Sequence, residues 1–255
     1  MPKPTPGSNF TACTNKLGGS WTFGTTPSAC NVSPAQSTAF VNAQYNAVIY
    51  KEGVSTARKD YMNEMYAMAK EAGTYYIKRR NPKVSQAEIN GFLAGFFTLM
   101  NQETFWTHYR KGADSITRYM RGDELHGYGL MQVDDRSHSV ALNQGKGVDL
   151  IENIVYGLDI YYAAWVKTAT ASCISSPTDY KSRARGAWSA YNGGTANNGI
   201  CRFANPKASH AQKDKDYLAK FDGKAWMGHI TNTNLESALN VSCLAEGVRP
   251  CALKR

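Results

Sequence analysis

The apolar positions of the chain predict a mainly helical protein, and the clearest helix begins near Ser85. Ser85 and Glu88 stand three positions apart, the spacing of an N-terminal capping box. Apolar residues then recur every three or four positions, which is the period of one helix face. They are Ile89, Phe92, Leu93, Phe96, Phe97 and Met100. We therefore expect an amphipathic helix that ends close to residue 103.

Weaker patterns predict the other elements. A second amphipathic helix should begin near Asp149, with Glu152 three positions on, and a third should run over about 179–192 and stop at two glycines. The predicted buried face of the second consists of Ile151, Ile154, Val155, Leu158, Tyr162 and Trp165. Residues 35–80 look helical with breaks at Gly53 and Gly73, and shorter helices are expected over 213–221 and 234–246.

The fold class that follows is mainly α, with a small β element. Residues 122–135 are short and glycine-punctuated, so they predict a turn or a small β-hairpin. Residues 1–35 are rich in Pro, Gly, Ser and Thr and predict an irregular segment that a disulfide holds. We expect residues 36–255 to form one domain that includes a C-terminal extension. No apolar run approaches the ~18 residues of a membrane span.

Six cysteines, none in a C-x-x-C pair, favour disulfides over a zinc or redox site. Neighbours along the chain would pair as 13–30, 173–201 and 243–251, although ~15 connectivities are open. Disulfides need an oxidising compartment, so we expect a secreted or periplasmic protein. Met1 precedes no apolar leader, which we interpret as a leader replaced by an initiator Met. A cytosolic protein with free thiols is the alternative.

The net charge of +9 indicates a polyanionic partner but does not identify it. Nucleic acid, anionic lipid and a bacterial wall would all be attracted to such a surface. The densest basic blocks, at 78–80 and 181–185, are short, and a solvated face explains both.

Glu103 is the candidate proton donor. It continues the helix face of Phe96, Leu99 and Met100, so its carboxyl should lie against apolar walls. Loss of hydration raises the pKa of such a carboxyl, which suits a general acid near neutral pH. The alternatives are a side chain turned to solvent or one paired with Arg110 or Lys111.

Two aspartates bracket a glycine-rich segment further along the chain. Residues 127–138 read GYGLMQVDDRSH. Asp123 lies before this run and Asp134 lies within it, 11 positions after Asp123. Two carboxyls in unequal environments are the usual apparatus of glycoside hydrolysis. In the alternative interpretation, Asp123 caps a turn and Asp134 pairs with Arg136.

The end of the third helix carries groups that suit a sugar. Aromatic rings pack on the C–H faces of a sugar, and amides bond to its oxygens. Tyr191 and Asn192 are the candidates, whereas Trp188 fits a sugar site and a protein core equally well.

These segments, in this order, resemble the goose-type lysozymes and, more loosely, the soluble lytic transglycosylases, over roughly residues 85–195. The resemblance implies an α+β lysozyme-like fold. It implies that Glu103 protonates the glycosidic oxygen of the β-1,4 bond between N-acetylmuramic acid and N-acetylglucosamine. It further implies that Asp123 and Asp134 position a water for hydrolysis. Gln132, His138, Tyr191 and Asn192 would bind the substrate.

We expect a monomeric muramidase that acts on peptidoglycan strands, with no metal, no cofactor and no nucleic acid partner. Two departures concern the substrate: bulky Phe105 and Trp106 follow Glu103, and the stretch from Glu103 to Asp123 is long. If both line the cleft near the cleaved bond, we expect a preference for a modified glycan, such as a de-N-acetylated one. In the alternative interpretation, these residues simply pack the inserted loop. A lytic transglycosylase that releases 1,6-anhydro-muramoyl products, and a wall-binding domain without activity, are the competing interpretations.

Overall fold

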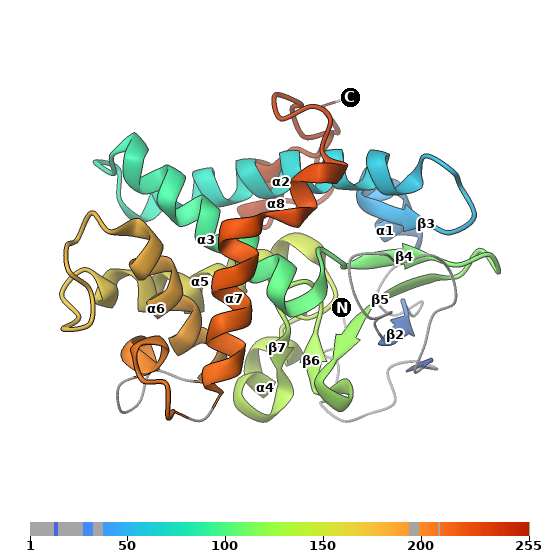
Figure 1. Cartoon of the computed structure of the whole chain (residues 1–255). Coiled ribbons are helices and arrows are strands. Elements are labelled where there is room, and N and C mark those ends of the chain that lie inside the picture. Colours follow the sequence, from blue (N-terminus) through green and yellow to red (C-terminus); the bar gives the residue numbers. More distant parts are fainter. Residues whose placement is uncertain (1–12, 15–27, 33–37, 194–198, 209, 255) are drawn as a thin grey trace. The chain divides into compact units, whose positions relative to one another are not determined.

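The computed structural model describes residues 13–14, 28–32, 38–193, 199–208 and 210–254. The chain forms two compact units that alternate along the sequence. The first, here called the sheet unit, comprises residues 1–72, 103–156 and 226–255. The second, the helical unit, comprises residues 73–102 and 157–225. The predicted fold class is confirmed, because helices predominate and a small mixed sheet accompanies them (Figure 1).

The sheet is larger than the predicted hairpin. The described strands are β1 (Cys13–Thr14), β2 (Ser28–Asn31), β3 (Ile49–Lys51), β4 (Tyr109–Lys111), β5 (Thr117–Gly122), β6 (Gly127–Tyr128) and β7 (Val133–Asp134). They pair in the order β1-β2-β5-β4-β3, with β6 between β5 and β7, and only β3 and β4 run parallel. The antiparallel β6–β7 pair is the predicted hairpin. β2 lies inside the segment predicted to be irregular, because its partner is β5, far along the chain.

The helices are α1 (Thr38–Gln44), α2 (Ala57–Arg80), α3 (Gln86–Thr104), α4 (Asp135–Asn143), α5 (Leu150–Thr168), α6 (Tyr180–Gly193), α7 (Ala211–Gly223) and α8 (Val241–Ala245). Short 3-10 turns are η2 (Asn46–Val48), η3 (Asp123–Leu125), η4 (Gly199–Ala204) and η5 (Ala225–His229). Gly53 makes a turn with φ 76°, as predicted, but α2 continues through Gly73. A Cβ at Gly73 would lie 2.6 Å from Leu93 Cδ2, so this glycine permits close helix packing rather than a break.

Local capping fixes where three of the helices begin. The Ser85 hydroxyl accepts the Glu88 amide at 3.1 Å, which confirms half of the capping box. The Glu88 carboxylate instead accepts from Trp165 and Arg183, both at 3.0 Å. Asp149 and Asp179 cap α5 and α6 in the same way, by accepting the amides of Glu152 and Ser182.

The helix predicted over 234–246 is shorter than expected. Side chains of α2 bind the backbone before it, since Glu71 Oε1 accepts the Ser237 amide at 2.8 Å. Asn240 then caps α8 by accepting the Cys243 amide. Residues 237–239 therefore satisfy their amides outside a helix, and the helix begins only after Asn240.

The two predicted disulfides that lie wholly within the described residues, Cys173–Cys201 and Cys243–Cys251, are present. Cys30 is also disulfide-bonded, and the β1–β2 register sets Cys13 opposite it. The Cys13 side chain lies outside the described residues, so the 13–30 pair stays a prediction. Across the described ranges, no helix combines the length and the apolar character that crossing a membrane requires.

Candidate functional site in the sheet unit

Glu103 lies in the last turn of α3 and is partly exposed. The residues of the predicted stripe, Phe96, Leu99 and Met100, are fully buried along the same helix. α3 ends one residue after Glu103, where Phe105 and Trp106 adopt left-handed backbone angles with φ 51° and 65°. Glu103 thus terminates an apolar helix, as predicted. Arg110, one of its alternative partners, forms an ion pair with Glu52.

Trp106 is part of the core and does not line a cleft. Its side chain is fully buried, its carbonyl oxygen accepts the Tyr61 hydroxyl at 2.6 Å, and its ring lies 6.0 Å from that of Trp226. The expectation that both bulky residues after Glu103 face a substrate is therefore wrong for Trp106. Phe105 is partly exposed, so it alone of the pair is accessible to a ligand.

The segment over residues 127–132 is joined directly to the end of α3. The Thr104 hydroxyl, next to Glu103, donates to the Leu130 carbonyl at 3.1 Å. Gly129 has φ 69°, and a Cβ there would lie 2.6 Å from Asn153 Oδ1 and 2.7 Å from the Gly147 carbonyl. Only glycine fits this position, because both the backbone angle and the space exclude a side chain.

A buried histidine and a buried asparagine form hydrogen bonds with the backbone of the 127–132 segment. His108 Nδ1 accepts the Leu130 amide at 2.9 Å, and Nε2 donates to the Val148 carbonyl at 2.8 Å. Burial lowers the pKa of His108 to about 4, which keeps the ring neutral, as these two bonds require. Asn153 accepts the Met131 amide at 2.9 Å and donates to the Tyr128 carbonyl at 3.0 Å.

These two positioning residues were not among the predicted site residues. His108 is an isolated histidine, and nothing around it in the sequence distinguishes a ligand from a core group. Asn153 gives a weak signal, because an amide between Ile151 and Ile154 on a helix face that should be buried must satisfy its hydrogen bonds inside the protein.

Gln132, a predicted substrate ligand, folds back on its own segment. Its Nε2 donates to the Gly129 carbonyl at 2.8 Å, and φ at Gln132 is 48°. A Cβ at Gly122 or Gly127 would lie 2.0 or 2.2 Å from Gln132 Oε1. The carboxamide therefore packs over Gly122 at the end of β5 and Gly127 at the start of β6, which explains why those positions carry no side chain.

Asp123 and Asp134 meet on one arginine. Arg136 Nη2 forms ion pairs with Asp123 Oδ2 and with Asp134 Oδ2, and Arg136 Nε lies 3.1 Å from both oxygens of Asp134. Asp134 also caps α4 by accepting the Arg136 amide at 2.7 Å. Hydrogen bonds from Arg136 lower the pKa of Asp134, so this carboxyl stays ionised at neutral pH. The structure thus brings the two aspartates together, and the Asp134–Arg136 pairing of the alternative interpretation is present as well.

The turn that carries Asp123 has an unusual backbone. Asp123, Glu124 and Leu125 have φ values of 47°, 55° and 75°, and none is a glycine. Each left-handed residue of this kind costs roughly 1–2 kcal/mol. Strain of this size persists only where surrounding contacts enforce it, and it concentrates at functional sites.

His138, another predicted ligand, lies in α4 beside Tyr156. Its Nδ1 is 3.0 Å from the Tyr156 hydroxyl, and the two rings meet edge to face at 5.5 Å. Burial lowers the pKa of His138, which favours the neutral ring. When one nitrogen of a neutral imidazole is hydrogen-bonded to a tyrosine hydroxyl, the other nitrogen can still form a hydrogen bond with a ligand.

Tyr191 and Asn192 belong to the helical unit, at the end of α6, and both are partly exposed. Asn192 Oδ1 accepts from Arg202 Nη1 at 3.3 Å, and Arg202 forms a buried ion pair with Asp214. Trp188 is buried and stacks on Tyr217 with ring centroids 4.8 Å apart, so it is a core residue. A sugar-binding role for Tyr191 and Asn192 stays a prediction.

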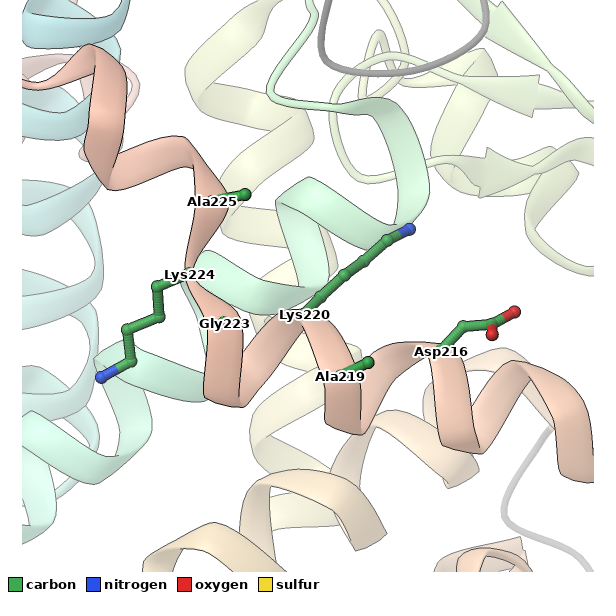
Figure 2. A pocket seen from close by; sticks show the side chains of 6 residues that line it. All are labelled: Asp216, Ala219, Lys220, Gly223, Lys224 and Ala225. Carbon is green, nitrogen blue, oxygen red and sulfur yellow. The ribbon is translucent and has the colours of Figure 1, made fainter.

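A hollow at the C-terminal end of α7 lies apart in sequence from every predicted site residue. Its lining consists of Asp216, Ala219, Lys220, Gly223, Lys224 and Ala225. Figure 2 shows that the Lys220 and Lys224 side chains point in different directions, so their charges do not converge on one anion. In the part of the chain that the structure describes, no three His, Cys, Asp or Glu side chains form a group that could hold a metal ion.

Comparison of the chain with protein-family models, with curated proteins and with solved structures finds no match. The resemblance to goose-type lysozymes therefore rests on the motifs alone.

Proposed function

We propose that this protein is a muramidase, a glycoside hydrolase that cleaves the β-1,4 bond between N-acetylmuramic acid and N-acetylglucosamine in peptidoglycan. One observation carries the proposal: Thr104, next to Glu103, is bonded to the 127–132 segment, and the aspartates of the 123–125 turn and of β7, on either side of that segment, form ion pairs with one arginine. A carboxyl at the end of an apolar helix and a second, ionised carboxyl group are the two components that glycoside hydrolysis needs.

In this mechanism, Glu103 donates its proton to the glycosidic oxygen as the bond to C1 breaks. Asp123 and Asp134 accept hydrogen bonds from the water that attacks C1. Arg136 forms ion pairs with both, and its hydrogen bonds lower the pKa of Asp134, which makes Asp134 a weak base but a good acceptor. Both aspartates orient the water while positive charge develops on the sugar, and as the water oxygen bonds to C1 a water proton passes to Asp123.

A lytic transglycosylase is a second candidate, because Arg136 contacts one carboxylate oxygen of Asp123 and both oxygens of Asp134. If the remaining Asp123 oxygen does not reach the water at C1, no water is positioned there. The 6-hydroxyl of the muramoyl sugar would then attack C1 and give a 1,6-anhydro product. A wall-binding domain without activity is the third possibility, and it predicts binding of peptidoglycan with no product.

The disulfides Cys173–Cys201 and Cys243–Cys251 support a secreted or periplasmic location, because such bonds persist in oxidising compartments. In that location the protein would act on peptidoglycan strands as a monomer.

Digestion of purified sacculi tests these candidates. Hydrolysis creates one new reducing end per cleavage, whereas transglycosylation gives products one water lighter with no new reducing end. Mass spectrometry of the soluble fragments separates the two. Wall binding without any fragment would overturn both enzymatic assignments.

A further inference from the structure

The Arg121 side chain links the sheet to the 123–125 turn. It is buried at 6% exposure, and its Nη2 donates to the Leu125 carbonyl oxygen. Nη1 donates to the Tyr119 hydroxyl at 3.3 Å, and the guanidinium lies 3.5 Å from the centroid of the Tyr128 ring. The guanidinium is thus fixed by strands β5 and β6 and reaches the last residue of the turn.

The 123–125 turn needs a contact of this kind to keep its left-handed backbone angles. Its three left-handed residues are not glycines, and the Asp123 and Glu124 side chains are exposed rather than packed. Within the turn, the His126 amide donates to the Asp123 carbonyl at 2.9 Å. If the backbone relaxed to right-handed angles, the Cβ of Asp123 would point elsewhere and its carboxylate would leave Arg136.

We propose that Arg121 is a positioning residue for the reaction: it holds the strained 123–125 turn so that the Asp123 carboxylate lies beside Asp134 on Arg136. This inference rests on the proposed function, and it assigns to a buried residue of β5 the choice between water and a sugar hydroxyl as the attacking group.

The two attacking groups, water and the muramoyl 6-hydroxyl, give different products, and the experiment measures the ratio of those products. In hydrolysis, Glu103 gives its proton to the leaving oxygen, the water oxygen bonds to C1, and a water proton passes to Asp123. Without a positioned water, the muramoyl 6-hydroxyl oxygen bonds to C1 instead and returns its proton to Glu103. Loss of the turn therefore slows hydrolysis and raises the fraction of anhydro products.

Arg121→Gln is the test variant, and Arg118→Gln is its matched control. Arg118 lies on the same strand and is also buried, at 8% exposure, but it donates to Asp114 and to the Ile116 carbonyl, away from the turn. Both variants remove one buried guanidinium from β5, but of the two side chains it is Arg121 that donates to the turn.

We expect Arg121→Gln to slow hydrolysis by on the order of 100-fold, the effect of misplacing a reacting group by about 1 Å. Asp123→Asn should have a similar effect. The double variant should be no slower than either single one, because both changes remove the same positioned carboxylate. Arg118→Gln should retain hydrolysis within about threefold of wild type, because substitutions outside a coupled network act independently.

A rescue variant separates this role from general loss of stability. Glycine adopts left-handed angles freely, so Glu124→Gly should restore part of the hydrolysis lost in Arg121→Gln. Hydrogen exchange at the His126 amide, which bonds inside the turn, gives a readout that does not depend on activity. That exchange should accelerate in Arg121→Gln and not in Arg118→Gln.

Equal behaviour of Arg121→Gln and Arg118→Gln in product ratio and in His126 exchange would overturn the inference. So would multiplicative effects of Arg121→Gln and Asp123→Asn. If Arg121→Gln does not fold, Arg121→Lys, which keeps a donor for Leu125, should show the same changes in weaker form, and wild-type behaviour of that variant would count against the proposal. A wild-type protein that releases no product overturns the proposed function and the catalytic role of Arg121 together, whereas unchanged exchange at His126 overturns the inference alone.

Discussion

The helical unit carries fourteen Lys and Arg residues against six Asp and Glu, whereas the sheet unit carries fifteen against fourteen. Of the net charge of +9, the helical unit therefore supplies +8. Four of its acids already form ion pairs, with Arg80, Lys181, Arg183 and Arg202. Its remaining cations make it the part of the molecule that long-range attraction to a polyanion would favour.

Strained backbone angles, unlike the net positive charge, are concentrated in the sheet unit. Of the nine non-glycine residues with positive φ among those described, seven belong to the sheet unit. Six of these, all but Ser115, lie next to or within the candidate catalytic segments: Phe105, Trp106, Asp123, Glu124, Leu125 and Gln132. Under the proposed function, the chemistry would take place in the strained sheet unit and the basic helical unit would supply the electrostatic attraction.

The largest effect that tests this division is expected at Glu103. Glu103→Gln removes the proton donor but keeps the shape of the side chain, so turnover should fall by at least ~10²–10⁴-fold. Asp216→Asn, an exposed acid of the helical unit, changes the net charge equally and should leave turnover intact. Initial rates of sacculus digestion check both. Turnover by Glu103→Gln at the wild-type rate would contradict the assignment.

The buried His108 predicts a pH-dependent stability. Burial lowers its pKa from 6.5 to about 4 in the folded state. Between these values the unfolded chain binds a proton that the folded chain does not, so stability is lost as pH falls through this window. The loss attributable to His108 is at most roughly 3 kcal/mol.

Urea unfolding of wild type and His108→Gln at pH 7 and pH 4.5 measures this effect. The variant should be less stable at pH 7 and should lose less stability on acidification. His210→Gln, at an exposed position of the helical unit, is the control and should follow wild type. Parallel pH profiles for wild type and His108→Gln would rule out a buried neutral histidine.

The sequence predicted what depends on local periodicity and missed what depends on distant partners. The Ser85 cap and the starts of α5 and α6 followed from short-range pattern, and so did the place of Glu103 at the end of an apolar helix. The β2–β5 pairing joins residues about ninety positions apart in sequence, and no local signal indicates it. Only a folded chain shows that Arg136 reaches Asp123 as well as its neighbour Asp134, or that Trp106 points inward.

Because Trp106 is buried, the predicted preference for a modified glycan now depends on Phe105. Its ring is the bulky group after Glu103 that a substrate could meet, and bulk there would disfavour an N-acetyl group. Wild type should therefore cleave de-N-acetylated sacculi faster than acetylated ones, and Phe105→Ala should reduce that difference by about tenfold, the value of one lost contact. Initial rates on native and enzymatically deacetylated sacculi decide this. Equal rates for wild type on both would remove the preference without affecting the role of Glu103.

The smallest expected effect concerns the charge of the helical unit. Lys213 and Lys215 are exposed on α7, and Lys51 and Lys59 are exposed in the sheet unit. Replacing either pair by Glu lowers the net charge by the same four units. If the helical unit supplies the attraction to the wall, the α7 double variant should bind sacculi more weakly, by roughly threefold to tenfold at low salt, while the sheet-unit double variant should bind nearly as wild type.

The salt dependence distinguishes this attraction from a specific contact. The Debye length falls from about 30 Å at 0.01 M to about 8 Å at 0.15 M ionic strength, so a long-range contribution should largely disappear over that range. Co-sedimentation of each variant with sacculi at both ionic strengths gives the comparison. A deficit of the α7 variant that persists at high salt would indicate direct contacts of Lys213 and Lys215 instead. Equal losses in both double variants would show that the wall responds to net charge alone, and the proposed division between the two units would then hold for the chemistry but not for the attraction.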